Sequence, residues 1–189
     1  RLHYINAINH DEIPVKLWKE RARKSIYKRL NSENKQINAQ QAYSGKIYTK
    51  QELCKQLGIK NGVKIGFVAA HIFKDAPHLS SSMLHDDYYF WLLDTINCCA
   101  KSQKVHWIFK PHPSASYYGE DGLVEQLVQN QDAVNLHLCP NDLNTSSLQG
   151  CADVILTVLG TIGLEYSCLG IPTILAGTSF YAGFGFTYE

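Results

Sequence analysis

Five short runs of β-branched and other apolar residues, separated by stretches of helical character, constrain the fold more than any other feature. The runs lie at residues 63–70, 105–109, 134–138, 154–158 and 173–176. Their length and composition are typical of buried strands. The stretches between them predict helices at residues 86–100, 120–129, 143–149 and 161–169. Because strands that alternate with helices form parallel sheets with right-handed crossovers, we expect a Rossmann-like α/β domain over residues 61–189, its parallel sheet flanked by helices.

Residues 1–60 predict a helical connecting segment. Pro14 suits the first turn of a helix, and apolar residues recur at helical spacing after it. The polar run over residues 31–41 interrupts that spacing and predicts a linker. Thr49 and Glu52 then have the spacing of a capping box, so we expect a second helix to begin there.

Charge is divided unevenly along the chain, although the formal net charge of its 189 residues is only +1. Residues 1–60 hold 13 Lys and Arg against 5 Asp and Glu, whereas residues 61–189 hold 5 against 12. A basic segment of this kind contacts nucleic acid, anionic lipid or an acidic partner domain, or it is a solvated helix. No basic motif interleaved with aromatic residues is present, so nucleic acid is not an expected partner.

Hydropathy and cysteine content are those of a cytoplasmic globular protein. No run approaches the roughly 18 continuous apolar residues of a transmembrane helix. The six cysteines include no CxxC pair, so we expect reduced, mostly buried thiols and neither a disulfide framework nor a zinc site. The sequence begins at Arg1 and ends at Glu189 after a run rich in glycine and aromatic residues, and we expect a fragment of a longer protein.

The loop after the second predicted strand is rigid and polar. It reads Lys110-Pro-His-Pro-Ser114, and its two prolines, including Pro113, restrict the backbone around His112. A preorganised imidazole can donate to a phosphate or stack near a base, while Lys110 adds a positive charge and Ser114 a hydroxyl. We expect these residues to bind a nucleotide. The alternative is a stiff strand exit in which His112 bonds a backbone carbonyl.

The fourth predicted strand is followed by Gly160 and a helix that begins near Thr161. Gly160 permits a close backbone approach, and the free N–H groups of a helix start favour an anion such as a nucleotide phosphate. Glu165, one turn further on, is placed to reach a ribose hydroxyl or a sugar. The alternatives are that Thr161 is a plain N-cap and that Glu165 is an exposed helix carboxylate.

The loop after the first predicted strand holds four chemically active residues, His71, Lys74, Asp75 and His78. Such a density beside a strand end favours a site. We expect Asp75 to act as a base and His71 to hold a phosphate or a carboxylate. His71, Asp75 and His78 could together hold a metal by residue type, but no second motif supports this, so no metal is predicted.

The loop after the fifth predicted strand combines glycines, hydroxyls and aromatic rings. Thr178, Ser179 and Tyr181 are candidates for contacts with a sugar, although the loop also fits a simple start of the next element. Neither a GxGxxG pattern nor a Walker A motif is present, so a dinucleotide or ATP is disfavoured and no cofactor is expected.

These motifs together resemble the bacterial capsule polysaccharide biosynthesis glycosyltransferases. The matching segments are Lys110-Pro-His-Pro113, Gly160-Thr-Ile-Gly-Leu-Glu165, Gly170-Ile-Pro172 and Phe180-Tyr-Ala-Gly-Phe-Gly-Phe-Thr187. The resemblance implies a GT-B architecture, in which two Rossmann-like domains face a cleft and the C-terminal one holds the nucleotide-sugar donor. It covers residues 61–189, so we expect the N-terminal domain, and with it the acceptor site, to be missing.

The same resemblance implies the substrates. Bacterial β-Kdo transferases use CMP-Kdo, and the similar teichoic-acid-type polymerases use CDP-linked polyols, so a cytidine nucleotide is the favoured donor. His112 and Pro113 match the His-Pro motif that contacts the nucleotide, and Thr161 matches the hydroxyl residue at the phosphate-binding helix start. Asp75 and His71 match no family motif. We expect a cytoplasmic glycosyltransferase of capsular or lipopolysaccharide synthesis, with a glycan or glycolipid acceptor, at the inner face of the inner membrane.

Three other functions are open. A CDP-polyol phosphotransferase of teichoic-acid type and a UDP-sugar 2-epimerase share the expected architecture. A non-catalytic domain that uses its basic residues 1–60 to bind a membrane or nucleic acid belongs to a different class.

Overall fold

A computed structural model describes residues 15–31, 37–75 and 83–189, which form two separate units. The first unit, residues 1–43, contains α2 (Val15–Leu30) and α3 (Ile37–Ala42). The helix α2 confirms the prediction of a helix after Pro14. The helix α3 corrects the prediction of a linker over residues 31–41. Its alanines are the strongest helix formers, and its glutamines are good helix formers although they are polar.

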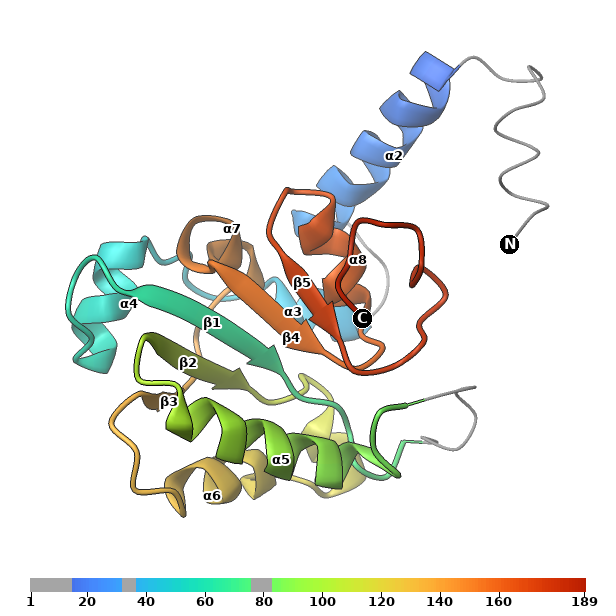
Figure 1. Cartoon of the computed structure of the whole chain (residues 1–189). Coiled ribbons are helices and arrows are strands. Elements are labelled where there is room, and N and C mark those ends of the chain that lie inside the picture. The colour runs from blue at the N-terminus through green and yellow to red at the C-terminus, as the bar shows by residue number, and fades with distance from the viewer. Residues whose placement is uncertain (1–14, 32–36, 76–82) are drawn as a thin grey trace. The chain divides into compact units, whose positions relative to one another are not determined.

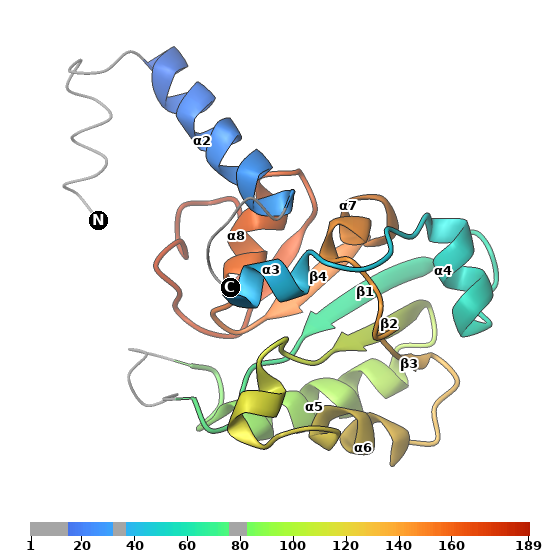
Figure 2. The same ribbon diagram turned by 180° about the vertical axis from the view of Figure 1, so that it is seen from behind.

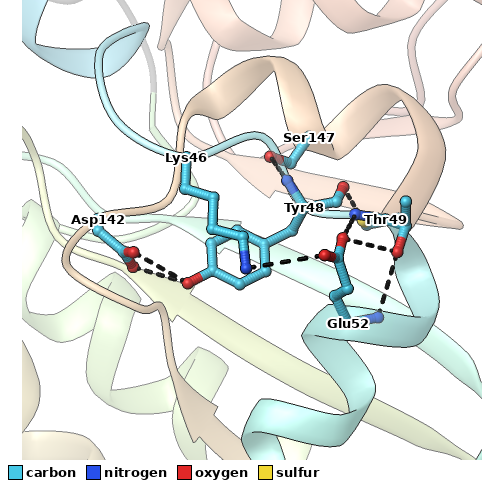
Figure 3. Close-up of polar contacts among 7 residues, drawn as sticks. Lys46, Tyr48, Thr49, Glu52, Asp142 and Ser147 are labelled. Atoms are coloured by element: carbon cyan, nitrogen blue, oxygen red, sulfur yellow. Dashed lines mark hydrogen bonds and ion pairs between the residues drawn. The ribbon is translucent and has the colours of Figure 1, made fainter.

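The second unit begins at Ser44, earlier than the boundary expected at residue 61. The helix α4 (Lys50–Leu57) belongs to it because Leu53 and Cys54 are buried in its core. The predicted capping box is confirmed: Thr49 accepts from the Glu52 N–H, and the Glu52 carboxylate accepts from the Thr49 N–H (Figure 3). The helix ends at Gly58 in the left-handed conformation.

Tyr48 connects the segment before α4 to the rest of this unit through hydrogen bonds (Figure 3). Its hydroxyl lies 2.9 and 3.0 Å from the two carboxylate oxygens of Asp142, and its N–H donates to the Ser147 hydroxyl at 2.9 Å. The Lys46 ammonium lies 4.3 Å from the centre of the Tyr48 ring and 3.7 Å from the Glu52 carboxylate. Burial of Tyr48 and its bond to Asp142 raise the pKa of its phenol. These contacts explain why the boundary lies before residue 44.

A five-stranded parallel sheet forms the centre of the second unit, as predicted (Figure 1). Its order is β3-β2-β1-β4-β5. The strands are β1 (Lys64–Ala69), β2 (Val105–Lys110), β3 (Leu136–Leu138), β4 (Val154–Thr157) and β5 (Thr173–Leu175). The third strand is shorter than predicted, because Val134 is 91% exposed and lies outside the sheet.

Helices cover both faces of the sheet (Figures 1 and 2). On one face, α5 (Tyr88–Lys101) and α6 (Leu123–Gln129) pack against Val68, Phe109 and Val158. On the other lie α7 (Leu148–Cys151) and α8 (Thr161–Ser167). Two single-turn helices complete the unit, η2 (Ala115–Tyr118) and η3 (Thr145–Ser147). Among the residues that the structure describes, no helix has the length and apolar character needed to span a bilayer.

Gly66 on the central strand β1 permits a close approach of the Trp107 side chain, which comes from the neighbouring strand β2. It pairs with Trp107 on β2, and a Cβ atom at residue 66 would lie 2.3 Å from two carbons of the indole. The Trp107 ring packs against the core that α5 and α6 cover. Glycine is therefore required here by packing rather than by backbone conformation.

Candidate functional site at the carboxyl ends of the strands

The sheet order reverses between β1 and β4, and several of the predicted site residues surround this point. From β1 the chain runs outward through β2 to β3, and it then returns to the other side of β1 at β4. In open α/β sheets, ligands bind in the crevice beyond the carboxyl ends of the strands where the order reverses. The loops that leave β1, β2 and β4 carry His71, His112 and Gly160, respectively.

His71 connects the end of β1 to the loop after β4. Its Nε2 lies 3.1 Å from the Thr157 hydroxyl and 3.3 Å from the backbone nitrogens of Val158 and Leu159. Because a backbone N–H can only donate, Nε2 is the unprotonated nitrogen and Nδ1 carries the proton. The imidazole also stacks on Tyr88, with 4.4 Å between ring centres.

The surroundings of His71 keep it neutral. Burial, and secondarily the nearby imidazole of His112, lower the pKa of His71 to about 4. At neutral pH it therefore carries no positive charge toward a phosphate, and its Nε2 lone pair is already occupied. What His71 can offer a ligand is the Nδ1–H donor, and its contacts identify it chiefly as the residue that orients the loop after β4.

His112 is half-buried and held in one orientation. Its Nδ1 accepts from the Ser114 N–H at 3.1 Å, so the alternative in which it bonds a backbone carbonyl is not the observed one. The flanking residues Lys110 and Pro113 are also half-buried, whereas Ser114 is 3% exposed. Burial lowers the pKa of His112, and the negative charges of Asp75 and Glu120 oppose that effect.

A buried carboxylate that the sequence did not indicate joins the loops after β1 and β2. Glu120 is 4% exposed and accepts from the N–H groups of Phe73 and Lys74, both at 2.8 Å. The ammonium of Lys74 donates to the Tyr118 carbonyl at 2.8 Å. Asp75 follows directly and is exposed. The only signal in the sequence is an acidic residue after Gly119, between a strand and a helix.

His78, the third residue of the metal alternative, lies outside the described residues. Within the described part of the chain, no group of three or more histidine, cysteine and acidic side chains is arranged to hold a metal ion.

The helix α8 begins at Thr161 as predicted, and the alternative in which Thr161 is a plain N-cap is wrong. Gly160 is the N-cap and provides no side-chain cap, so Thr161 is the first helical residue, exposed, and not the N-cap. A Cβ atom at residue 160 would lie 2.8 Å from the Thr157 hydroxyl, which explains the glycine. The Gly160 carbonyl accepts from the hydroxyl of Tyr181, so the loop after β5 is tied to this turn.

Glu165 is buried, at 3% exposure, rather than an exposed helix carboxylate. Burial, with a contribution from the negative charge of Glu165, raises the pKa of Tyr181 to about 12. In the same loop as Tyr181, Ser179 is 7% exposed and Thr178 is exposed. The electrostatic interactions thus link His71, His112 and Asp75. Gly160 lies next to His71 and accepts a hydrogen bond from Tyr181, which interacts with Glu165.

This topology is that of a Rossmann-like α/β domain, with a parallel sheet between two layers of helices. Among solved structures, the chain is similar to the KpsC β-Kdo 2,4-transferase of Thermosulfurimonas dismutans, with a TM-score of 0.64 and 17% identity over 96% of this chain and 51% of that one. It is also similar to the KpsC β-Kdo 2,7-transferase of the same organism, with a TM-score of 0.56 and 21% identity over 98% and 50% of the two chains.

The chain spans about half the length of these two structures. No protein-family model and no curated protein sequence matches it. The resemblance to the capsule polysaccharide glycosyltransferases, first indicated by short motifs, is confirmed at the level of the fold.

Proposed function

We propose that the chain is the donor-binding half of a glycosyltransferase of bacterial capsular or lipopolysaccharide synthesis, and that its donor is CMP-Kdo or another cytidine nucleotide. The observation that carries the proposal is the convergence of His71, His112 and Gly160 where the sheet order reverses. The similarity of the fold to two β-Kdo transferases supports the same function. We further propose that a second Rossmann-like domain supplies the site for a glycan or glycolipid acceptor.

The proposed reaction is a displacement at the anomeric carbon of the donor sugar. The acceptor oxygen forms a bond to that carbon as the bond to the nucleotide phosphate breaks, and the acceptor proton passes to Asp75. The negative charge that develops on the phosphate is stabilised by His112, Lys110 and Thr161. His71 contributes by holding the loop that carries Gly160, since its own charge is absent at neutral pH.

Nucleotide binding tests this proposal directly. By calorimetry, we expect the folded chain to bind CMP or CDP more tightly than UDP. His112→Ala should weaken binding about 10- to 100-fold, because it removes a charge-assisted hydrogen bond. His106→Ala is the matched control, since His106 lies on the same strand four residues before Lys110 and bonds His137 instead.

Each other result points elsewhere. If no nucleotide binds the folded protein, the donor-binding proposal is wrong. A preference for UDP with epimer formation indicates a sugar-nucleotide 2-epimerase. Transfer of a polyol phosphate from a CDP-linked polyol indicates an enzyme of teichoic-acid type.

A second feature, in the first unit, supports peripheral binding to the inner-membrane surface. The helix α2 holds seven basic residues and one acidic residue. Trp18, Ala22, Ile26 and Leu30 recur at every fourth position and so share one side of the helix. Trp18 is 41% exposed. A basic helix with an apolar side that includes tryptophan binds the interface of an anionic bilayer.

Vesicle binding tests this feature. We expect the chain to sediment with vesicles that contain phosphatidylglycerol but not with neutral ones, and to be released by high salt. Replacing Lys24 and Lys28 with glutamate should reduce binding at least about tenfold, because each basic residue near an anionic surface contributes about 1 kcal/mol. Lys101→Glu, on α5, is the control. Equal binding to anionic and neutral vesicles would contradict the proposal. Salt-sensitive binding to DNA would favour a nucleic-acid function.

A further inference from the structure

Glu120 is an acidic side chain that the fold buries at the edge of the candidate site. A buried carboxylate is costly unless hydrogen bonds replace its hydration. Here one carboxylate oxygen accepts from the Phe73 N–H and the other from the Lys74 N–H. Both bonds measure 2.8 Å, so the two oxygens hold two consecutive peptide groups of the loop after β1.

Glu120 is itself fixed to the connection between β2 and α6. Its N–H donates to the Ala115 carbonyl at 3.0 Å, and its carbonyl accepts from the Leu123 N–H at 3.3 Å. Gly119, with φ of 66°, allows the reversal that follows η2. The bond from the Lys74 ammonium to the Tyr118 carbonyl adds a second tie between the same two loops.

We propose that Glu120 is a positioning residue that fixes the candidate base Asp75 relative to His112. This inference rests on the proposed function. Asp75 comes immediately after the two peptide groups that Glu120 holds, and His112 lies at the start of the connection to which Glu120 belongs. Without the carboxylate, the loop that carries Asp75 would lose two of its bonds to the loop after β2.

The charge of Glu120 has a second effect, on His112. Two carboxylates, Asp75 and Glu120, interact electrostatically with His112. His112 in turn interacts with the imidazole of His71. The two carboxylates raise the pKa of His112 against the effect of burial. Neutralising Glu120 should therefore lower the pKa of His112 further, which a purely structural role would not require.

The test compares Glu120→Gln with Glu125→Gln, the same substitution on the neighbouring helix α6. The glutamine amide can accept only one of the two N–H groups and turns a donor toward the other. By NMR, we expect amide exchange at Phe73 and Lys74 to accelerate on the order of tenfold or more in Glu120→Gln. The pKa of His112 should fall, and CMP affinity should fall by about tenfold. Glu125→Gln should change none of these.

Glu120→Asp separates geometry from charge and serves if the glutamine variant does not fold. It keeps the charge but shortens the reach, so amide protection should fall while the His112 titration stays near that of the wild type. Unchanged amide exchange at Phe73 and Lys74 in both variants, or an unchanged His112 titration in Glu120→Gln, would overturn the inference. Amide exchange and the His112 titration could both change as expected while the wild type binds no CMP. In that case Glu120 does connect the two loops, but the proposed function, and with it the catalytic purpose of this connection, is wrong.

Discussion

Replacing Gly66 with alanine is expected to lower the free energy of unfolding by about 3 kcal/mol, a large effect for one added methyl group. The new Cβ would lie 2.3 Å from two carbons of the Trp107 indole, well inside van der Waals contact. Gly66 lies on the central strand β1, so the backbone has neighbours on both sides and cannot easily move away. The indole must shift instead, and it would disturb the core under α5 and α6.

Urea unfolding followed by circular dichroism measures this loss. Gly150→Ala, in the helix α7, is the control, because a Cβ atom at residue 150 would meet no atom within 4 Å, and we expect no loss of stability there, since alanine favours a helix over glycine by up to about 1 kcal/mol. In the double variant with Trp107→Leu, the combined loss should be smaller than the sum of the two single losses, since the colliding ring is gone. Additive losses would show that the collision is not the cause.

Acidification from pH 6.5 to pH 4 is expected to destabilise the protein through His71. Its pKa is about 4 in the folded chain and 6.5 in the reference state. The unfolded chain therefore binds more protons in this interval, and stability falls as the pH falls. The contribution of His71 is fully present above pH 6.5, declines toward pH 4 and is lost below it. The shift corresponds to roughly 3 kcal/mol, the second large effect.

The slope of unfolding free energy against pH measures this effect. His71→Asn should lower stability at pH 7, because an amide replaces the stacked ring, but it should flatten the slope between pH 4 and pH 6.5. His137 has a pKa of about 4 for the same main reason, burial, and so contributes a slope of the same sign. His137→Asn is therefore the comparison that shows the effect of removing one such histidine. An unchanged slope in His71→Asn would contradict the neutral, accepting state assigned to His71.

The fold could be predicted from the sequence because its signals are local. Each strand is a short run rich in β-branched residues. The helix α4 is predicted by Thr49, Glu52 and Gly58, which all belong to the helix or its caps. The linker prediction failed at α3 because polar residues such as glutamine are also good helix formers. The start of the second unit at Ser44 is not visible in the sequence, because the partners of Tyr48 lie 94 and 99 residues further along the chain.

The site was predictable only in its location. Residues that follow parallel strands meet at one edge, so His71, His112 and Gly160 could be placed near each other. Their chemical states depend on distant partners. The proton position on His71 follows from Val158 and Leu159, which lie 87 and 88 residues away. The role of Glu120 is not visible in the sequence, because its partners, Phe73 and Lys74, precede it by 47 and 46 residues.

The lengths of the outer strands bear on how the domain behaves at high concentration. An edge strand offers unpaired backbone groups on which another molecule can add a strand, and natural proteins limit this by keeping such edges short. β3 and β5 have three residues each. On the β5 side, Tyr188 already bonds Leu175 and Thr173 through its backbone. The sheet thus presents few sites for lateral growth, which disfavours aggregation of the domain by strand addition.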